Sequence, residues 1–151
     1  PMTLPTFDSA RDEILGLFNT KWSADTPALN GGVPIRVEWP GVDAGDPPPA
    51  DKPYVRITLR HTTSRQATFG HTGGRRFTRP GLITVQVFTP LSGGQGLSLA
   101  EKCAIIARDA FEGRGTASGI WFRNARIQEI GPDGTWYQMN VLVEFVYDEL
   151  R

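Results

Sequence analysis

The chain has 151 residues and a mass of 16.6 kDa, the usual size of one domain with one sizeable core. Hydrophobic residues make up 39% of it, which indicates a folded chain, while 17 Gly and 12 Pro predict many turns and at least one long loop. A single cysteine excludes an internal disulfide and a cysteine-based zinc site, and no stretch approaches the roughly 18 apolar residues of a membrane span. We therefore expect one domain over residues 1–151, with no membrane segment, metal or cofactor.

The net charge of zero conceals a segregated distribution of charge along the chain. Residues 1–51 have eight acidic side chains against three basic ones, residues 52–100 have seven basic and no acidic ones, and residues 101–151 have eight acidic and six basic ones. Such segregation suits a surface with a basic and an acidic patch, which can bind an anionic partner or a second copy head to tail. The alternative is that folding interleaves the segments and cancels the field.

Two segments have the apolar spacing of an amphipathic helix. Between Phe7 and Trp22, apolar residues recur every three or four positions, which predicts a helix of about four turns. Residues 98–112 form the second: they begin with Ser-Leu-Ala-Glu, the form of a capping box, and Gly113 suits the position after the helix.

The remaining ordered segments alternate apolar and polar residues, as strands with one buried face do. The predicted strands are 33–39, 54–60 and 83–87, then a closing hairpin with strands 120–130 and 137–147 that turns at residues 131–134. The order α-β-β-β-α-β-β favours an α+β domain, with an antiparallel or partly mixed sheet and two helices packed on it.

Two long connections interrupt this pattern. Residues 40–53 form an acidic proline-rich loop, which cannot adopt regular structure. Residues 61–81 join two strands through a polar, glycine-containing segment that we expect to be a long basic loop. Long loops in compact domains are usually functional or disordered.

The residues that could take part in catalysis or ligand binding are better explained by structural roles. Cys103 falls on the apolar stripe of the second helix, where cysteine behaves as a small hydrophobe. His61 and His71 lie in the basic loop with no neighbouring carboxylate to orient them. The glycines at residues 93–96 lack the rest of a phosphate-binding fingerprint. We expect no enzymatic activity.

The basic loop is the candidate functional region. Arginine contacts phosphate and aromatic rings stack on bases, so the loop could bind nucleic acid. Arginine and aromatic residues are also enriched at protein interfaces, and a pI near 7.3, well below that of dedicated nucleic-acid binders, favours this second interpretation. The expected contact residues are Arg65, Phe69, Arg75, Arg76, Phe77 and Arg79.

Several stretches are similar to a known family. The sequences QATFG at 66–70, RRFTRPG at 75–81 and VQVFTP at 85–90, with GTWYQMNV at 134–141 and FVYDE at 145–149, resemble the phage tail-terminator-like family. These are small tail completion proteins of long-tailed phages and prophages, and the resemblance covers most of residues 54–149.

This resemblance implies a non-enzymatic virion protein with an α+β fold. Such proteins form a hexameric ring that caps the tail tube, stops its elongation and provides the surface for head-tail joining. The implied partners are other copies of the chain, the tail-tube protein and a head-completion or neck protein, while DNA only passes through the ring lumen. The implied location is the head-proximal end of the tail, after synthesis in the host cytoplasm. The alternatives are a nucleic-acid-binding module using loop 61–81, or another neck or minor tail protein.

Overall fold

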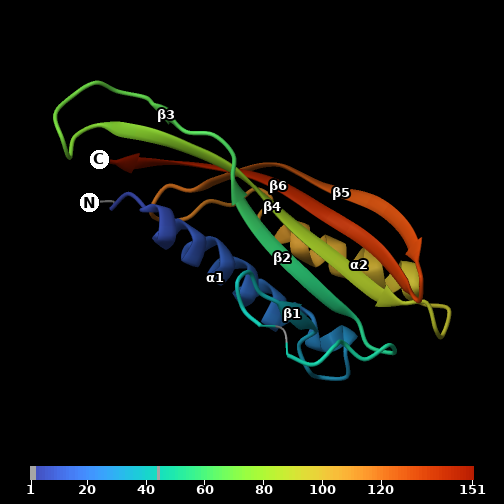
Figure 1. Ribbon diagram of the computed structural model, residues 1–151. Coiled ribbons are helices and arrows are strands. Elements are labelled where there is room, and N and C mark those ends of the chain that lie inside the picture. The colour runs from blue at the N-terminus through green and yellow to red at the C-terminus, as the bar shows by residue number, and fades with distance from the viewer. Residues whose placement is uncertain (1–2, 44) are drawn as a thin grey trace.

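The computed structural model describes residues 3–43 and 45–151 (Figure 1). Residues 1, 2 and 44, which fall within the predicted domain and, for the last, within the acidic proline-rich loop, lie outside the described residues. The elements in chain order are α1 (Phe7–Asp25), the 3₁₀ helix η1 (Pro27–Leu29), β1 (Arg36–Glu38), β2 (Tyr54–His61), β3 (Arg65–Gln66), β4 (Arg76–Pro90), α2 (Gly96–Asp109), β5 (Trp121–Asp133) and β6 (Trp136–Leu150).

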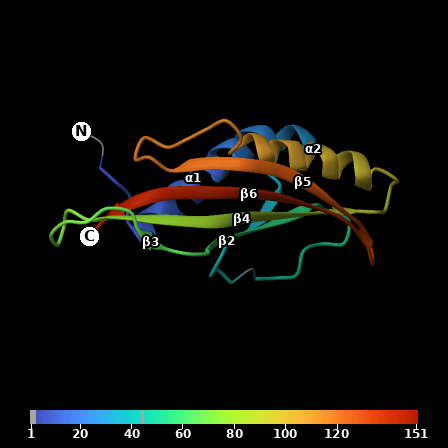
Figure 2. The same ribbon diagram turned by 90° about the horizontal axis from the view of Figure 1, so that it is seen from above.

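The strands form one six-stranded sheet in the order β1-β2-β4-β6-β5, with β3 pairing on β4. All pairs are antiparallel except β1 with β2, so the sheet is mixed. Helices α1 and α2 lie on the same side of the sheet, and within the described residues the other side is free of helices (Figure 2). The predicted α+β fold, with two helices on a mainly antiparallel sheet, is confirmed.

Helix α1 begins at a capping box that the sequence pattern did not reveal. Thr6 Oγ1 accepts from Ser9 N at 3.3 Å, and Ser9 Oγ accepts from Thr6 N at 2.8 Å. The predicted periodicity then brings one apolar face onto the sheet, and Trp22 also donates from Nε1 to the carbonyl of Ile35 at 3.0 Å. The buried residues of this face are Ala10, Ile14, Phe18 and Trp22.

Helix α2 starts and ends earlier than its sequence predicts. Gln95 precedes its first residue, Gly96, and makes no side-chain capping bond, so the predicted capping box at Ser98 is wrong. Cys103 is fully buried, and burial raises the pKa of its thiol to about 12. The prediction that this cysteine is a core residue is confirmed.

Three strand predictions need correction. The closing turn lies at residues 134–135, because a register shift between Glu129 and Gly131 lets Asp133 pair with Trp136. The predicted strand 33–39 is only Arg36–Glu38. The predicted loop 61–81 is shorter, because His61 ends β2 and residues 76–81 begin β4, where they continue the ladder with β6 to its last residue. Polar composition misled the prediction, because residues 76–81 lack the alternating aliphatic side chains of residues 83–87.

Candidate interaction surface

The pair β4 and β6 extends past the helices at one end of the molecule. Each strand has 15 residues, and they pair over their whole length. In both views, β3, the start of β4 and the C-terminus project together beyond α1 and α2 (Figures 1 and 2). We call this projection, residues 65–79 with residues 148–151, the arm.

Hydrogen bonds define the shape of the arm. The backbones of Arg75 and Arg151 bond to each other in both directions, at 3.2 and 2.8 Å. Across the loop, Ala67 N donates to the carbonyl of Arg76 at 2.8 Å, and Thr68 Oγ1 accepts from Arg76 N at 2.9 Å. The arm is therefore a closed β structure with a tip at residues 69–74.

Arg79 is the best-anchored arginine of the arm. Its Nε donates to Glu149 Oε1 at 3.1 Å, and Ser64 Oγ accepts a further bond from its guanidinium. The guanidinium also lies over the ring of Phe77, 5.2 Å from its centre. The Arg79 and Glu149 side chains are only 15% and 14% exposed, so this pair holds the base of the arm together.

Arg76 lies on the opposite face of β4 from Arg79, because successive residues of a strand point to opposite sides. Its guanidinium is 3.6 Å from Asp148 Oδ2, in a half-exposed pair. Arg56 likewise pairs with Glu38 at 3.0 Å. Arg56, Arg76 and Arg79 thus fit the alternative that folding interleaves the charged segments, because each of them pairs with a carboxylate from another segment.

The structure brings only part of the predicted contact set together. Phe77 and Arg79 share one face of β4, whereas Arg76 lies on the other. Arg65 is exposed on β3, and Arg75 lies where the tip loop returns. Phe69, at the tip, is 98% exposed. The candidate surface is thus the tip and sides of the arm.

His61 occupies the junction of the arm and the core, with partners that sequence reasoning missed. Its Nε2 lies 2.7 Å from the hydroxyl of Tyr147, and its ring stacks on Phe7 with a centroid distance of 3.9 Å. Burial lowers the pKa of His61 below its usual 6.5. Burial also raises the pKa of Tyr147 to about 12. These groups fasten α1 to the sheet at the point where the arm begins.

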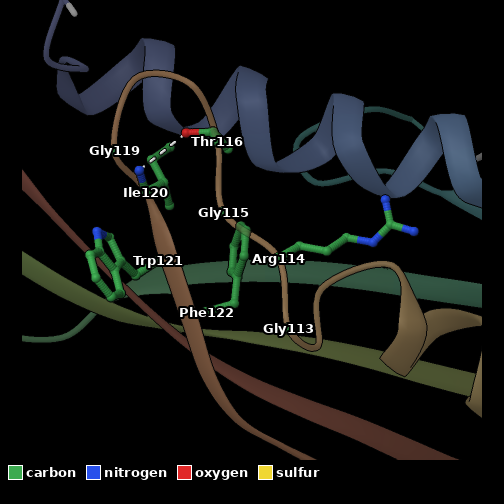
Figure 3. Close-up of a pocket in the computed structure, with 8 residues that line it drawn as sticks. All are labelled: Gly113, Arg114, Gly115, Thr116, Gly119, Ile120, Trp121 and Phe122. Carbon is green, nitrogen blue, oxygen red and sulfur yellow. Dashed lines mark hydrogen bonds between the residues drawn. The ribbon is translucent and has the colours of Figure 1, made fainter.

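A second surface lies along β5, an edge strand of the sheet. Beside it is an open hollow of about 590 Å³, formed where the connection after α2 turns into β5 (Figure 3). Trp121 and Arg114 extend to opposite sides of this hollow, and Trp121 is 70% exposed (Figure 3). Ser118 Oγ donates its one proton to the Glu13 carboxylate, both oxygens of which lie 2.7 Å away, and this bond holds the connection against α1.

Among residues 3–43 and 45–151, no three His, Cys, Asp or Glu side chains gather closely enough to hold a metal ion. None of the helices in the described part of the chain is long and apolar enough to cross a membrane. The two surfaces described above each expose a large aromatic side chain, Phe69 at the tip of the arm and Trp121 at the β5 edge.

Comparison with known proteins supports the fold. The sequence matches no protein-family model and no curated protein. One solved structure, whose name is only a sequence identifier, is similar with a TM-score of 0.62 at 17% identity, covering 93% of this chain and 96% of that one. A chain of the virion of a native gene transfer agent particle has a TM-score of 0.45 at 19% identity, covering 87% and 92%. At that TM-score the likeness is too weak to extend to this chain.

Proposed function

We propose that this chain is a structural tail terminator of a long-tailed phage or phage-like particle. It forms a ring that caps the tail tube, stops tube elongation and offers the surface for head-tail joining. The observation that carries the proposal is the arm. Two of the stretches that resemble tail terminators, residues 66–70 and 75–81, fall largely within it, and it presents Phe69 almost fully to solvent.

The arm has the chemistry of a contact surface. An aromatic ring exposed at the end of a projecting β structure contributes little to the stability of its own subunit. Aromatic and arginine side chains are the groups that most often dominate binding at protein interfaces. Arg65 and Arg75 flank Phe69 in the arm and supply such arginines, so the arm is suited to insert into a neighbouring subunit or the tube.

The same surface fits nucleic acid less well. Non-specific binding to DNA depends on basic side chains that are available to neutralise phosphates. In the arm, Arg76 and Arg79 are already paired with Asp148 and Glu149, which reduces the positive field. This supports a protein partner over the alternative of a nucleic-acid-binding module.

We also propose that the role is not enzymatic. Two of the groups that could do chemistry have structural roles: Cys103 is a protonated thiol in the core, and His61 bonds Tyr147. The proposed partners are five further copies in a ring of six, the tail-tube protein and a head-completion or neck protein. The proposed location is the head-proximal end of the tail in the virion, reached after synthesis in the host cytoplasm.

The variant Arg65→Ala/Phe69→Ala tests the role of the arm. Both residues are exposed, so the free energy of unfolding should change by only about 0.5 kcal/mol per substitution. Capping should be lost, and tubes polymerised with the variant should have a broad length distribution by electron microscopy. Leu97→Ala, which truncates an exposed apolar side chain on α2, is the matched control and should cap tubes normally. If the arm variant caps tubes as well as the unmodified chain, the arm is not the contact surface.

A further inference from the structure

We infer that copies of this chain meet head to tail, with the acidic loop of residues 40–53 of one copy resting on the β5 edge of the next. The inference rests on the proposed ring and identifies the two surfaces that build it. Its basis is local charge: the loop beside β1 has three aspartates against one lysine, whereas residues 113–128, which lead into β5 and form its first part, have three arginines and no acidic residue.

The loop beside β1, and not β1 itself, has surplus carboxylates: three aspartates against Lys52. Glu38 binds two guanidiniums, that of Arg56 at 3.0 Å and that of Arg36 at 3.7 Å. Arg36 also donates to the backbone carbonyl of Asp46 at 2.7 Å, which braces the loop against the strand. The carboxylates of Asp43 and Asp46 are exposed, and they have no ion-pair partner within the described residues. The loop therefore presents negative charge to a neighbour.

The connection before β5 and the first part of this strand have surplus guanidiniums, whereas the last part of β5 holds Glu129 and Asp133. Residues 113–128 contain three arginines and no acidic residue. Arg123 and Arg126 share one carboxylate, that of Glu144, at 3.9 and 3.6 Å. The exposed Trp121 lies on the same side of β5 as Arg123, two residues along the strand. A tryptophan beside arginines is the composition of an interface centre.

Both surfaces face the side of the sheet without helices. Arg123 pairs in register with Glu144, and Trp121 pairs with Val146, whereas Phe145 between them points into the core. Residues 45–53 of the connection before β2 also run along the helix-free side, at the other edge (Figure 2). Two copies placed edge to edge would thus bring acidic loop and basic edge together on one side.

The contact is made by side chains and not by continuing the sheet. β5 has register irregularities between Arg123 and Arg126 and between Glu129 and Gly131, and Asn124 has a left-handed φ of 54°. Such bulges bend an edge strand and block the pairing of a further strand. The hollow of about 590 Å³ beside Trp121 instead leaves room for an apolar side chain from the loop. Val42, which is 63% exposed next to Asp43, is the candidate.

This arrangement gives a heterologous interface. Two different surfaces of the same chain meet, so each added copy leaves one free surface of each kind until a ring closes. Two acidic loops repel each other, and so do two basic edges, which disfavours two-fold dimers in which a surface meets its own copy. The acidic loop, which the resemblance to tail terminators does not explain, thereby has a role.

Two charge-reversed variants test the inference when the self-association of each variant alone is compared with the association of the two variants mixed. The loop variant is Asp43→Lys/Asp46→Lys, and the edge variant is Arg123→Glu/Arg126→Glu/Glu144→Gln, whose last change avoids repulsion within the chain. Alone, each should self-associate more weakly than the unmodified chain by at least about tenfold, because like charges meet at every interface. Mixed at equal concentration, they should recover association, since each interface in an alternating ring again joins opposite charges.

Sedimentation at low salt measures these equilibria, and circular dichroism verifies that each variant is folded. The matched control Asp12→Lys/Glu101→Lys changes the net charge as much as the loop variant does, on exposed helix positions, and should associate normally. Association of either variant alone at the unmodified strength, no recovery on mixing, or an unmodified chain that stays monomeric would each overturn the inference. A chain that is monomeric alone but still caps tubes would leave the proposed function standing while this inference fails.

Discussion

The β4 and β6 pair differs along its length. In the part covered by the helices, which we call the covered end, every second side chain is apolar and buried. At the arm end, charged side chains of the two strands face each other. Ile83 and Val143 are a fully buried cross-strand pair of the first kind. Arg79 with Glu149, and Arg76 with Asp148, are pairs of the second kind. One ladder thus serves two purposes: its covered end supplies folding stability, and its free end keeps a surface available to a partner.

The largest expected effect is in the covered end. Phe18 is fully buried, with ring centroids 5.2 Å from Trp22 and 6.1 Å from Phe111. Phe18→Ala should lower the free energy of unfolding by about 3–5 kcal/mol, because it leaves a cavity among these rings. Denaturant unfolding measures the change. A loss no larger than that of the exposed-site control Leu97→Ala would contradict the division between the two ends.

A smaller effect is expected at the base of the arm. Arg79→Ala leaves the largely buried Glu149 carboxylate without its partner, so it should cost about 1–3 kcal/mol. Arg76→Ala, in a half-exposed pair, should cost less than about 1 kcal/mol. The double variant Arg79→Ala/Glu149→Ala should recover part of the larger loss in the same unfolding experiment. Equal costs for the two single variants would show that the two faces of the arm do not differ.

The smallest effect is a pH dependence at the junction. Burial and then Arg11 and Arg79 lower the pKa of His61, against the opposing charge of Glu149. Well above pH 6.5 the imidazole is neutral in both states. As the pH falls through its usual pKa of 6.5, the unfolded chain takes up the proton first, so the free energy of unfolding decreases.

His61→Gln should remove this part of the slope in unfolding experiments at a series of pH values below 6.5. The matched variant His71→Gln, in the exposed tip of the arm, should keep it. A free energy of unfolding that increases as the pH falls, and does so through His61, would mean that the folded state favours the charged imidazole.

The covered end could be predicted from the sequence. Burial of one face makes apolar residues repeat at regular intervals along a helix or strand, and this repeat is visible in the sequence. The residues from Phe7 to Trp22 and from Tyr137 to Tyr147 show this period plainly, and the structure buries the faces that it indicates. The start of α2 was missed for a related reason: Ser98 and Glu101 match a capping pattern, yet tertiary packing starts the helix at Gly96.

The arm could not be predicted in the same way. Its strand residues are polar, and the carboxylates that pair with Arg76 and Arg79 are about 70 positions further along the chain. Only the register of the ladder, set by the buried residues of β4 and β6, brings them opposite each other. The sequence did place Arg65 and Phe69 in a candidate contact region, and whether that region makes contacts remains a prediction.

The most direct test of the account is tube length. Tail-tube protein that polymerises without limit should be assembled with increasing amounts of the purified chain, and the tubes measured by electron microscopy. The account predicts that elongation stops, with a ring of this chain at one end of each tube and none along its sides. Tubes that keep growing at saturating amounts of the chain, with no ring at either end, would contradict it.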